Sequence, residues 1–174
     1  MLIIKKPAIN AERVTLKPFS AENAEDIMDI LTNETVAKTF MLPEYSERGQ
    51  ARPLAERLIF LSQPENTARL EVGIFLGDKV IGFINDVGFT DSSIELGYAL
   101  HPSFHNRGYA TEAVRALLPA LREMGFSEVK AGYFEGNHAS RRVMEKCGMT
   151  PTGETEEIEY RGRTLKAVMM SVKL

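Results

Sequence analysis

The residues best suited to chemistry lie between a predicted strand and a predicted helix, in the run His-Pro-Ser-Phe-His-Asn-Arg-Gly-Tyr-Ala-Thr-Glu-Ala at residues 101–113. The small residues Gly108 and Ala110 would let the phosphates of a ligand come close to the backbone. The first turn of the following helix would add unpaired N–H groups and the positive end of its dipole. We therefore predict an anion cradle at this loop.

Two better-known phosphate-binding loops do not match this run. The glycine, lysine and hydroxyl pattern of a Walker loop is missing, and only one of the three glycines of a dinucleotide fingerprint is present. Gly108 taken alone would equally well make only a tight turn into the helix. The local charge favours the cradle, because residues 105–147 hold seven Lys or Arg against five Asp or Glu in a chain of net charge −3.

Two histidines, the single cysteine and a run of glutamates are also candidates for chemistry, but none is assigned a catalytic or metal-binding role. His101 and His105 have the spacing of metal ligands on a helix, but Pro102 makes the segment a loop and no third ligand is evident, so no metal site is expected. Cys147 has no flanking histidine and is interpreted as a small core residue. An acidic run would attract a cationic amine, although a solvated strand edge has the same composition: Glu154, Glu156, Glu157 and Glu159.

The elements that must position the cradle follow from hydrophobic periodicity and turn residues. Strands are predicted at residues 13–19, 70–76, 79–87, 94–100, 129–134, 155–160 and 164–174. Helices are predicted beginning at Ser20, at residues 54–61 between two prolines, at residues 108–124 and from Asn137 to Cys147. A helix joins the strand at 94–100 to the strand at 129–134, so these two require a crossover and the sheet must be mixed.

Length and composition exclude several classes of protein. The 174 residues, of which 44% are hydrophobic and 26% charged, predict a single domain over residues 1–174 with a packed core. No apolar run exceeds four residues, whereas a membrane span needs about twenty. The stretch at residues 1–7 lacks the hydrophobic segment of a secretory signal, and a single cysteine fits a reducing compartment. We expect a cytoplasmic protein without membrane or nucleic-acid partners, since nucleic acids require a basic face.

The cradle is part of a longer set of motifs in chain order. These are Glu-Leu-Gly-Tyr-Ala-Leu-His-Pro at 95–102, Arg-Gly-Tyr-Ala-Thr-Glu-Ala at 107–113, Asn-His-Ala-Ser-Arg at 137–141 and Glu-Lys-Cys-Gly-Met at 145–149. Together with the opening run at 12–19, they resemble the GNAT superfamily of N-acetyltransferases, most closely the RimJ/RimL type that acetylates N-terminal amines of ribosomal proteins. The resemblance implies an α/β (α+β) fold whose mixed, mostly antiparallel sheet has about six to seven strands flanked by about four helices.

The resemblance also implies an acetyl-CoA site. The backbone of residues 98–100 would pair with the pantetheine arm as an added strand, the cradle would hold the pyrophosphate, Asn137 would bond the pantetheine, and Arg142 and Lys146 would meet the phosphates of the adenine nucleotide. His105 stands where the family has Gln or Arg, which weakens any role for that side chain. The implied cofactor-binding residues are Tyr98, Ala99, Leu100, His105, Asn106, Arg107, Gly108, Tyr109, Ala110, Thr111, Asn137, Ser140, Arg142 and Lys146.

Two residues are candidates for catalysis. An alkyl ammonium is mostly protonated at neutral pH, so a carboxylate that takes up its proton is useful; Glu95 is the candidate, although it would also fit a solvated strand position or a substrate-orienting role. Many GNAT members protonate the leaving thiolate with a tyrosine seven residues after the asparagine, where this chain has Met144. Ser140 is the best replacement, although a serine in a first helical turn often only bonds the backbone.

The function implied is transfer of the acetyl group of acetyl-CoA directly to a primary amine through a ternary complex. The acceptor would be a protein N-terminal amine or a small-molecule amine, because no motif in the N-terminal helices or the last hairpin identifies it. The missing tyrosine and the unusual His105 leave open a catalytically silent acyl-CoA-binding sensor or scaffold. Monomer and homodimer are both compatible with the sequence.

Overall fold

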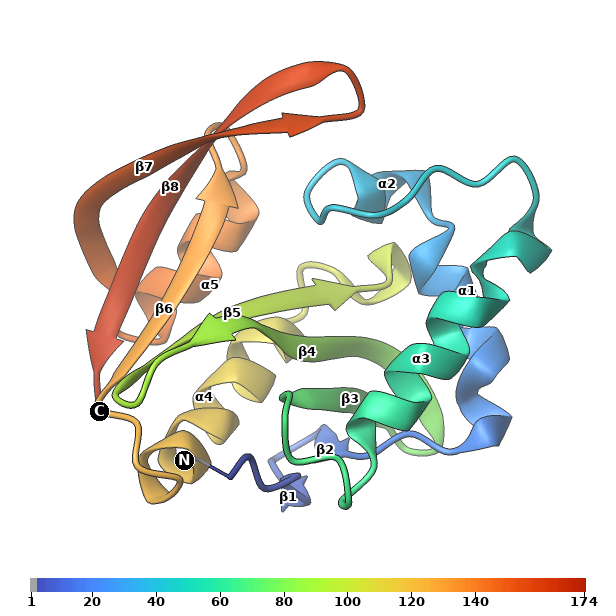
Figure 1. Ribbon diagram of the computed structural model, residues 1–174, viewed down its shortest axis with the longest axis horizontal. Helices are drawn as coiled ribbons and strands as arrows, with labels where there is room; N and C mark the ends of the chain where they lie inside the picture. The colour runs from blue at the N-terminus through green and yellow to red at the C-terminus, as the bar shows by residue number, and fades with distance from the viewer. Residues whose placement is uncertain (1–2) are drawn as a thin grey trace.

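The computed structural model describes residues 3–174, which form an eight-stranded sheet with five α-helices (Figure 1). The strands are β1 (Ile9–Asn10), β2 (Thr15–Lys17), β3 (Glu71–Leu76), β4 (Lys79–Phe89), β5 (Ser93–Leu100), β6 (Glu128–Phe134), β7 (Thr150–Tyr160) and β8 (Arg163–Lys173). They are arranged in the order β1-β2-β3-β4-β5-β6-β8-β7, and β5–β6 is the one parallel pair in this described sheet.

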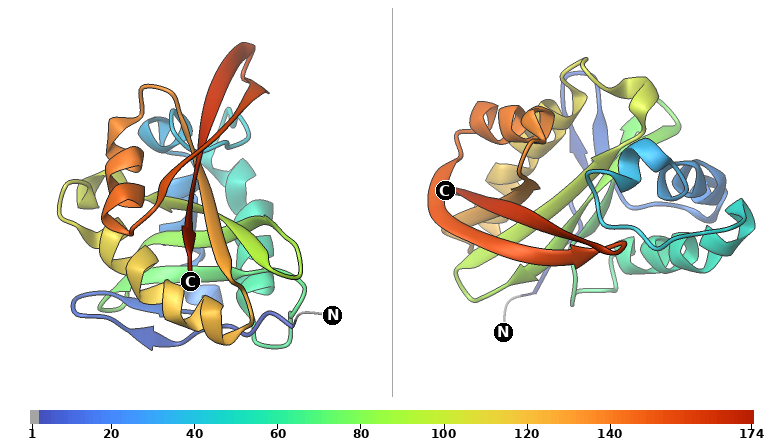
Figure 2. Two further views of the ribbon diagram at one scale, coloured as in Figure 1. Left: turned by 90° about the vertical axis from the view of Figure 1, so that its left-hand side faces the viewer. Right: turned by 90° about the horizontal axis from the view of Figure 1, so that it is seen from above.

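The helices cover both faces of the sheet. They are α1 (Ala24–Leu31), α2 (Glu34–Ala37), α3 (Arg52–Ser62), α4 (Tyr109–Glu123) and α5 (His138–Lys146). One core lies between the sheet and α4 and α5, and a second core lies between the sheet and α1, α2 and α3. Figure 2 shows the two groups of helices on opposite sides of the strands.

The strand β5 contributes side chains to both cores. Successive residues of a strand face opposite sides, so Leu96 packs in the α4–α5 core while Ala99 packs in the α1–α3 core. By the same alternation Tyr98 lies on the α4–α5 side and Glu95 on the α1–α3 side. The strand therefore presents different residues to the two faces of the sheet.

The sheet opens between β5 and β6. The two strands pair only where Ser93–Leu96 lies against residues 128–131. Beyond that point residues 97–100 stay paired with β4, and residues 132–134 stay paired with β8, so the strands are drawn apart (Figure 1). The last four residues of β5 thus have no strand partner on the side facing β6.

The predicted fold class is confirmed, with one more strand and one more helix than the sequence indicated. β1 was missed because it has only two residues, and α2 was missed because its four residues are too few to show a helical period. The side chain of Asn33 caps α2 by accepting hydrogen bonds from the N–H groups of Thr35 and Val36. No helix within residues 3–174 is long and apolar enough to cross a membrane, and Met1 and Leu2 of the N-terminal stretch lie outside the described residues.

Candidate active site

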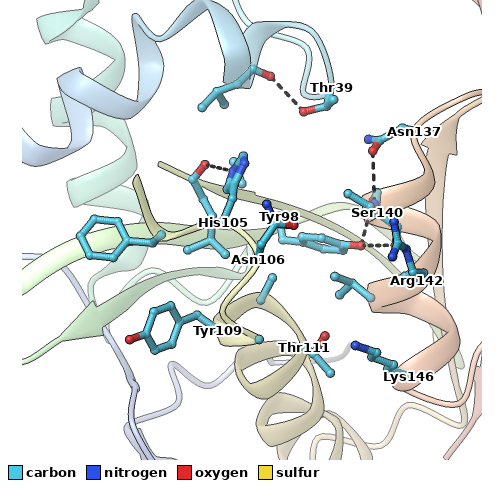
Figure 3. Close-up of a pocket in the computed structure, with 18 of the residues that line it drawn as sticks. Thr39, Tyr98, His105, Asn106, Tyr109, Thr111, Asn137, Ser140, Arg142 and Lys146 are labelled. Atoms are coloured by element: carbon cyan, nitrogen blue, oxygen red, sulfur yellow. Dashed lines mark hydrogen bonds between the residues drawn. The ribbon is translucent and has the colours of Figure 1, made fainter. Parts of the chain in front are cut away.

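A cavity of about 500 Å³ lies at the opening between β5 and β6 (Figure 3). It is lined by the end of β5, by residues of the loop before α4, by the first turn of α4, by residues along the length of α5, and by α2 with Thr39 two residues beyond it. Its volume is within the range of about 300–1,000 Å³ that is usual for ligand pockets.

Nearly all of the residues implied as cofactor-binding meet in this cavity. Thirteen of the fourteen line it, and Arg107 does not. Of the two catalytic candidates, Ser140 lines the cavity and Glu95 does not. Six lining residues were not predicted: Thr35, Val36, Thr39, Phe104, Ala139 and Val143. Asn33, a helix-capping residue, could have indicated the short helix that carries Thr35 and Val36, but not its place at the cavity.

The loop before α4 has the backbone conformation of an anion cradle. Asn106 and Gly108 have φ angles of 60° and 81°, whereas Arg107 between them does not have a positive φ. This alternation turns successive N–H groups toward one side. Gly108 is also the N-cap of α4, whose first-turn N–H groups open at the same place.

Both histidines of this region are bonded to the backbone. His105 Nε2 donates to the carbonyl oxygen of Leu100 at 2.9 Å and so ties the loop to the end of β5. His101 Nδ1 accepts from the N–H of Ser103 at 3.2 Å. Within residues 3–174, no three His, Cys, Asp or Glu side chains are grouped so that they could hold a metal ion. His105, which stands where the family has Gln or Arg, thus connects the loop before α4 to the end of β5.

A pair of hydroxyls bridges β5 and α5 beside the cavity. The hydroxyls of Tyr98 and Ser140 share a hydrogen bond of 2.9 Å, and the Tyr98 hydroxyl lies 3.2 Å from the Ser140 carbonyl oxygen (Figure 3). Burial raises the pKa of Tyr98 well above its ordinary value, and the hydrogen bond with the Ser140 side chain acts in the opposite direction. The phenol therefore keeps its proton at neutral pH. The sequence indicated Tyr98 only as a backbone contact.

The start of α5 is organised by Asn137. Its Oδ1 accepts from the N–H of Ser140 at 3.2 Å and caps the helix, which leaves the amide nitrogen as the donor end of the side chain. Arg142 and Lys146 follow on the same helix and line the cavity. Met144, at the position where many GNAT members have tyrosine, is 1% exposed and packs in the core.

Cys147 closes α5 as a core residue, as predicted from the sequence. It is 6% exposed, and its Sγ donates to the carbonyl oxygen of Thr111. Burial raises the pKa of its thiol to about 11. The thiol is therefore protonated at neutral pH and is a poor nucleophile.

Glu95 lies on the other face of the sheet, two residues before the opening begins. It is partly buried, and its backbone is paired with Gly88 and Lys130. Burial raises the pKa of its carboxyl group, the carboxylate of Glu156 adds to the effect, and the Lys130 ammonium opposes it. A carboxylate with a raised pKa takes up a proton more readily near neutral pH.

Known proteins resemble this chain in sequence and in fold. The family described as acetyltransferase (GNAT) domain matches residues 13–150. The uncharacterized N-acetyltransferase YnaD of Bacillus subtilis is 25% identical over 147 residues, covering 83% of this chain and 84% of its own. The FsC-acetyl coenzyme A-N(2)-transacetylase of Aspergillus fumigatus is 26% identical over 159 residues, covering 86% of this chain and 68% of its own.

Among solved structures, the ribosomal L7/L12 alpha-N-protein acetyltransferase RimL in complex with coenzyme A superposes with a TM-score of 0.83. It is 18% identical, and the match covers 97% of this chain and 98% of that one. At this identity the likeness concerns the fold. Together with the family match, this likeness identifies the fold, with its mixed sheet parted between two strands, as that of the GNAT class.

The match to the family profile covers most of the chain, and the chain belongs to the GNAT acetyltransferase family. It is an acetyl-CoA-dependent N-acetyltransferase. The residues at the cavity fit this co-substrate, because the loop presents a cradle for phosphates and β5 presents an unpaired backbone edge for an amide-containing arm.

Proposed function

We propose that this enzyme transfers the acetyl group of acetyl-CoA directly to a primary amine while both substrates are bound. The observation that carries the proposal is the parting of β5 from β6, which opens a cavity between the α4–α5 side and α2. An acetyl donor held along the open edge of β5 would be reached by an amine from the α1–α3 side, where Glu95 lies.

Each part of the donor has a matching feature in the cavity. The unpaired backbone of Tyr98, Ala99 and Leu100 would bind the pantetheine amides as an added strand. The amide nitrogen of Asn137 would donate to the same arm. The N–H groups at Asn106 and Gly108 and at the start of α4 would bind the pyrophosphate. Arg142 and Lys146 would bind the remaining phosphate. Bound in this way, acetyl-CoA supplies an activated acetyl thioester.

Glu95 would act as the general base. An incoming amine must lose a proton, and a carboxylate of raised pKa is a suitable acceptor near neutral pH. Because Glu95 does not line the cavity, we infer that it takes the proton through an intervening water molecule rather than by direct contact.

The pair Tyr98–Ser140 would protonate the departing sulfur. The position of the usual tyrosine is a buried methionine, so the proton must come from another group. Ser140 is the residue implied by the family resemblance, and the 2.9 Å bond to Tyr98 gives it a phenol from which its proton can be replaced. The two hydroxyls would thus work as one donor.

The acceptor class is open between two kinds of primary amine. One relative is named for acetylating the N(2) position of FsC, and one solved structure is named for acetylating a protein N-terminus. The test is thiol release from acetyl-CoA with a panel of peptides bearing free N-termini and of small amines. We expect release with at least one member. Acetyl-CoA binding without release for any amine would overturn the proposed transfer, and Gly108→Glu, which puts a carboxylate into the cradle, should abolish binding as a control.

A further inference from the structure

The backbone of the anion cradle has positive φ angles at Asn106 and Gly108, and contacts from outside the loop would stabilise this conformation. Asn106 has a φ of 60°, a region that residues other than glycine enter uncommonly, asparagine being one of the few that tolerate it. The carbonyl of Arg107 must point away from the cavity for the neighbouring N–H groups to face it. Contacts outside the loop are therefore required to fix the orientation of this peptide.

Arg13, just before β2, lies beside the end of the loop and the start of α4. Its Nη1 donates to the carbonyl oxygen of Arg107 at 2.8 Å. Its Nη2 lies 3.2 Å from the place where a Cβ on Gly108 would stand, and its guanidinium carbon lies 4.6 Å from the centre of the Tyr109 ring. The guanidinium thus lies against the back of the cradle, and neither Arg13 nor Arg107 lines the cavity.

Glu112 in the first turn of α4 holds Arg13 in this position. Its Oε2 bonds Arg13 Nε at 2.7 Å, and its Oε1 accepts from the N–H groups of Arg13 at 2.6 Å and Val14 at 3.0 Å. Burial works to raise the pKa of Glu112, but the two backbone N–H groups and the guanidinium outweigh it and lower the pKa. The Glu112 side chain is 13% exposed and that of Arg13 is 44% exposed, so the carboxylate is shielded from solvent while the guanidinium is only partly so.

We propose that Arg13 is the positioning residue of the anion cradle. Held by Glu112, it keeps the Arg107 carbonyl turned away from the cavity so that the loop's N–H groups meet a diphosphate. This inference rests on the proposed acetyl-CoA site and adds a residue that does not touch the ligand. Because the Glu112 carboxylate balances its charge, Arg13 acts through geometry rather than through attraction of the phosphates.

Calorimetric titration of CoA and of dephospho-CoA into Arg13→Gln, Arg13→Lys and the parent protein tests this inference. Arg13→Gln loses the side-chain bonds to Arg107 and Glu112 but keeps the backbone bond to Glu112. We expect about tenfold weaker binding of both ligands, since each hydrogen bond contributes a modest net free energy. Arg13→Lys keeps the positive charge, but an ammonium group cannot reproduce the planar guanidinium that bonds Arg107 and Glu112 at once. The affinity of this variant for both ligands should therefore fall nearly as much. The salt dependence of binding should not change in Arg13→Lys, because this variant keeps the net charge on which screening acts.

A matched control and a spectroscopic signal separate positioning from stability. Arg122→Gln makes the same chemical change at an exposed site near the other end of α4 and should leave both affinities unchanged. The amide resonance of Gly108 should shift in Arg13→Gln but not in Arg122→Gln. If Glu112 acts through Arg13, adding Glu112→Gln to Arg13→Gln should weaken binding little further.

Three results would contradict the inference. The first is a folded Arg13→Gln or Arg13→Lys protein that binds CoA within twofold of the parent. The second is a loss confined to CoA, with dephospho-CoA unaffected, which would place the effect at the terminal phosphate. Each of these two results would contradict the role of Arg13 without contradicting the proposed function. The third is a parent protein that binds no CoA, which would remove the proposed function together with this inference.

Discussion

At the scale of single residues, the hydroxyl pair of Tyr98 and Ser140 makes the first prediction. Tyr98→Phe removes the shared 2.9 Å hydrogen bond and the phenolic proton, so we expect kcat to fall by about a hundredfold, within the range of general acid catalysis. Ser140→Ala should have a similar effect if the pair works as one donor. The affinity for acetyl-CoA should be nearly unchanged, because both residues can still contribute their backbones.

Steady-state kinetics with an acceptor from the amine panel would check this prediction, with Tyr133→Phe on β6 as the control tyrosine. A Tyr98→Phe enzyme with parental kcat would show that the phenol does not supply the proton. Equal losses in kcat and in acetyl-CoA affinity would instead indicate a structural role.

Glu95 makes a prediction about pH. A general base works only when deprotonated, so kcat/KM should fall as the pH drops through the raised pKa of Glu95. Glu95→Gln should lower the rate and remove this acidic limb, while the affinity for acetyl-CoA stays the same. The measurement is the pH–rate profile of both proteins. An acidic limb that persists in Glu95→Gln would have to belong to another group, and Glu95 would not be the base.

At the scale of elements, the turn between β7 and β8 is tied to the segment that follows α2. The Tyr160 hydroxyl donates to the carbonyl oxygen of Ala37 at 2.8 Å and accepts from the N–H of Leu42 at 3.1 Å. Arg161 Nη2 donates to the carbonyl oxygen of Pro43 at 3.1 Å. These contacts connect the β7–β8 turn to residues 37–43. They therefore help to hold α2, which carries Thr35 at the cavity.

Tyr160→Phe should loosen this connection. The substitution keeps the ring stacked on Phe134 but loses the hydroxyl, and we expect a loss of about 1 kcal/mol in the free energy of unfolding. Hydrogen exchange of residues 34–44 should become faster. Thr164→Val is the matched control, because it removes a hydroxyl on the same hairpin that bonds Glu159 instead. Equal exchange rates in the parent and Tyr160→Phe would show that the segment is held by other contacts.

The sequence predicted the elements of the site better than the distances between them. β5, α4 and α5 were found because each carries a full hydrophobic period or a capping residue. The bond between Tyr160 and Ala37 joins residues 123 positions apart, and no local pattern encodes such a contact. The contact of Arg13 with the cradle could not be predicted from the sequence either, because it depends on a salt bridge to Glu112, 99 positions away.

At the scale of the whole molecule, the stability of the fold should depend on pH through a buried carboxyl group that does not line the cavity. Glu71 at the start of β3 is 2% exposed, and its Oε1 has no hydrogen-bond partner within the described part of the chain. Burial raises its pKa well above the ordinary value, Lys6 and Arg69 act to lower it, and Asp86 adds to the rise. The folded state therefore binds this proton more tightly than the unfolded state does.

The sign of the effect follows from that difference in proton binding. The contribution of Glu71 to stability is complete below the pKa of the unfolded chain and is lost as the pH rises toward the pKa of the folded state. Glu71→Gln carries no titrating proton, so its free energy of unfolding relative to the parent should increase steadily between pH 4 and pH 8. Urea denaturation at several pH values measures this difference, with Glu56→Gln at an exposed position of α3 as the control. If the parent and Glu71→Gln change in parallel over this range, the buried carboxyl group does not govern the pH dependence of the fold.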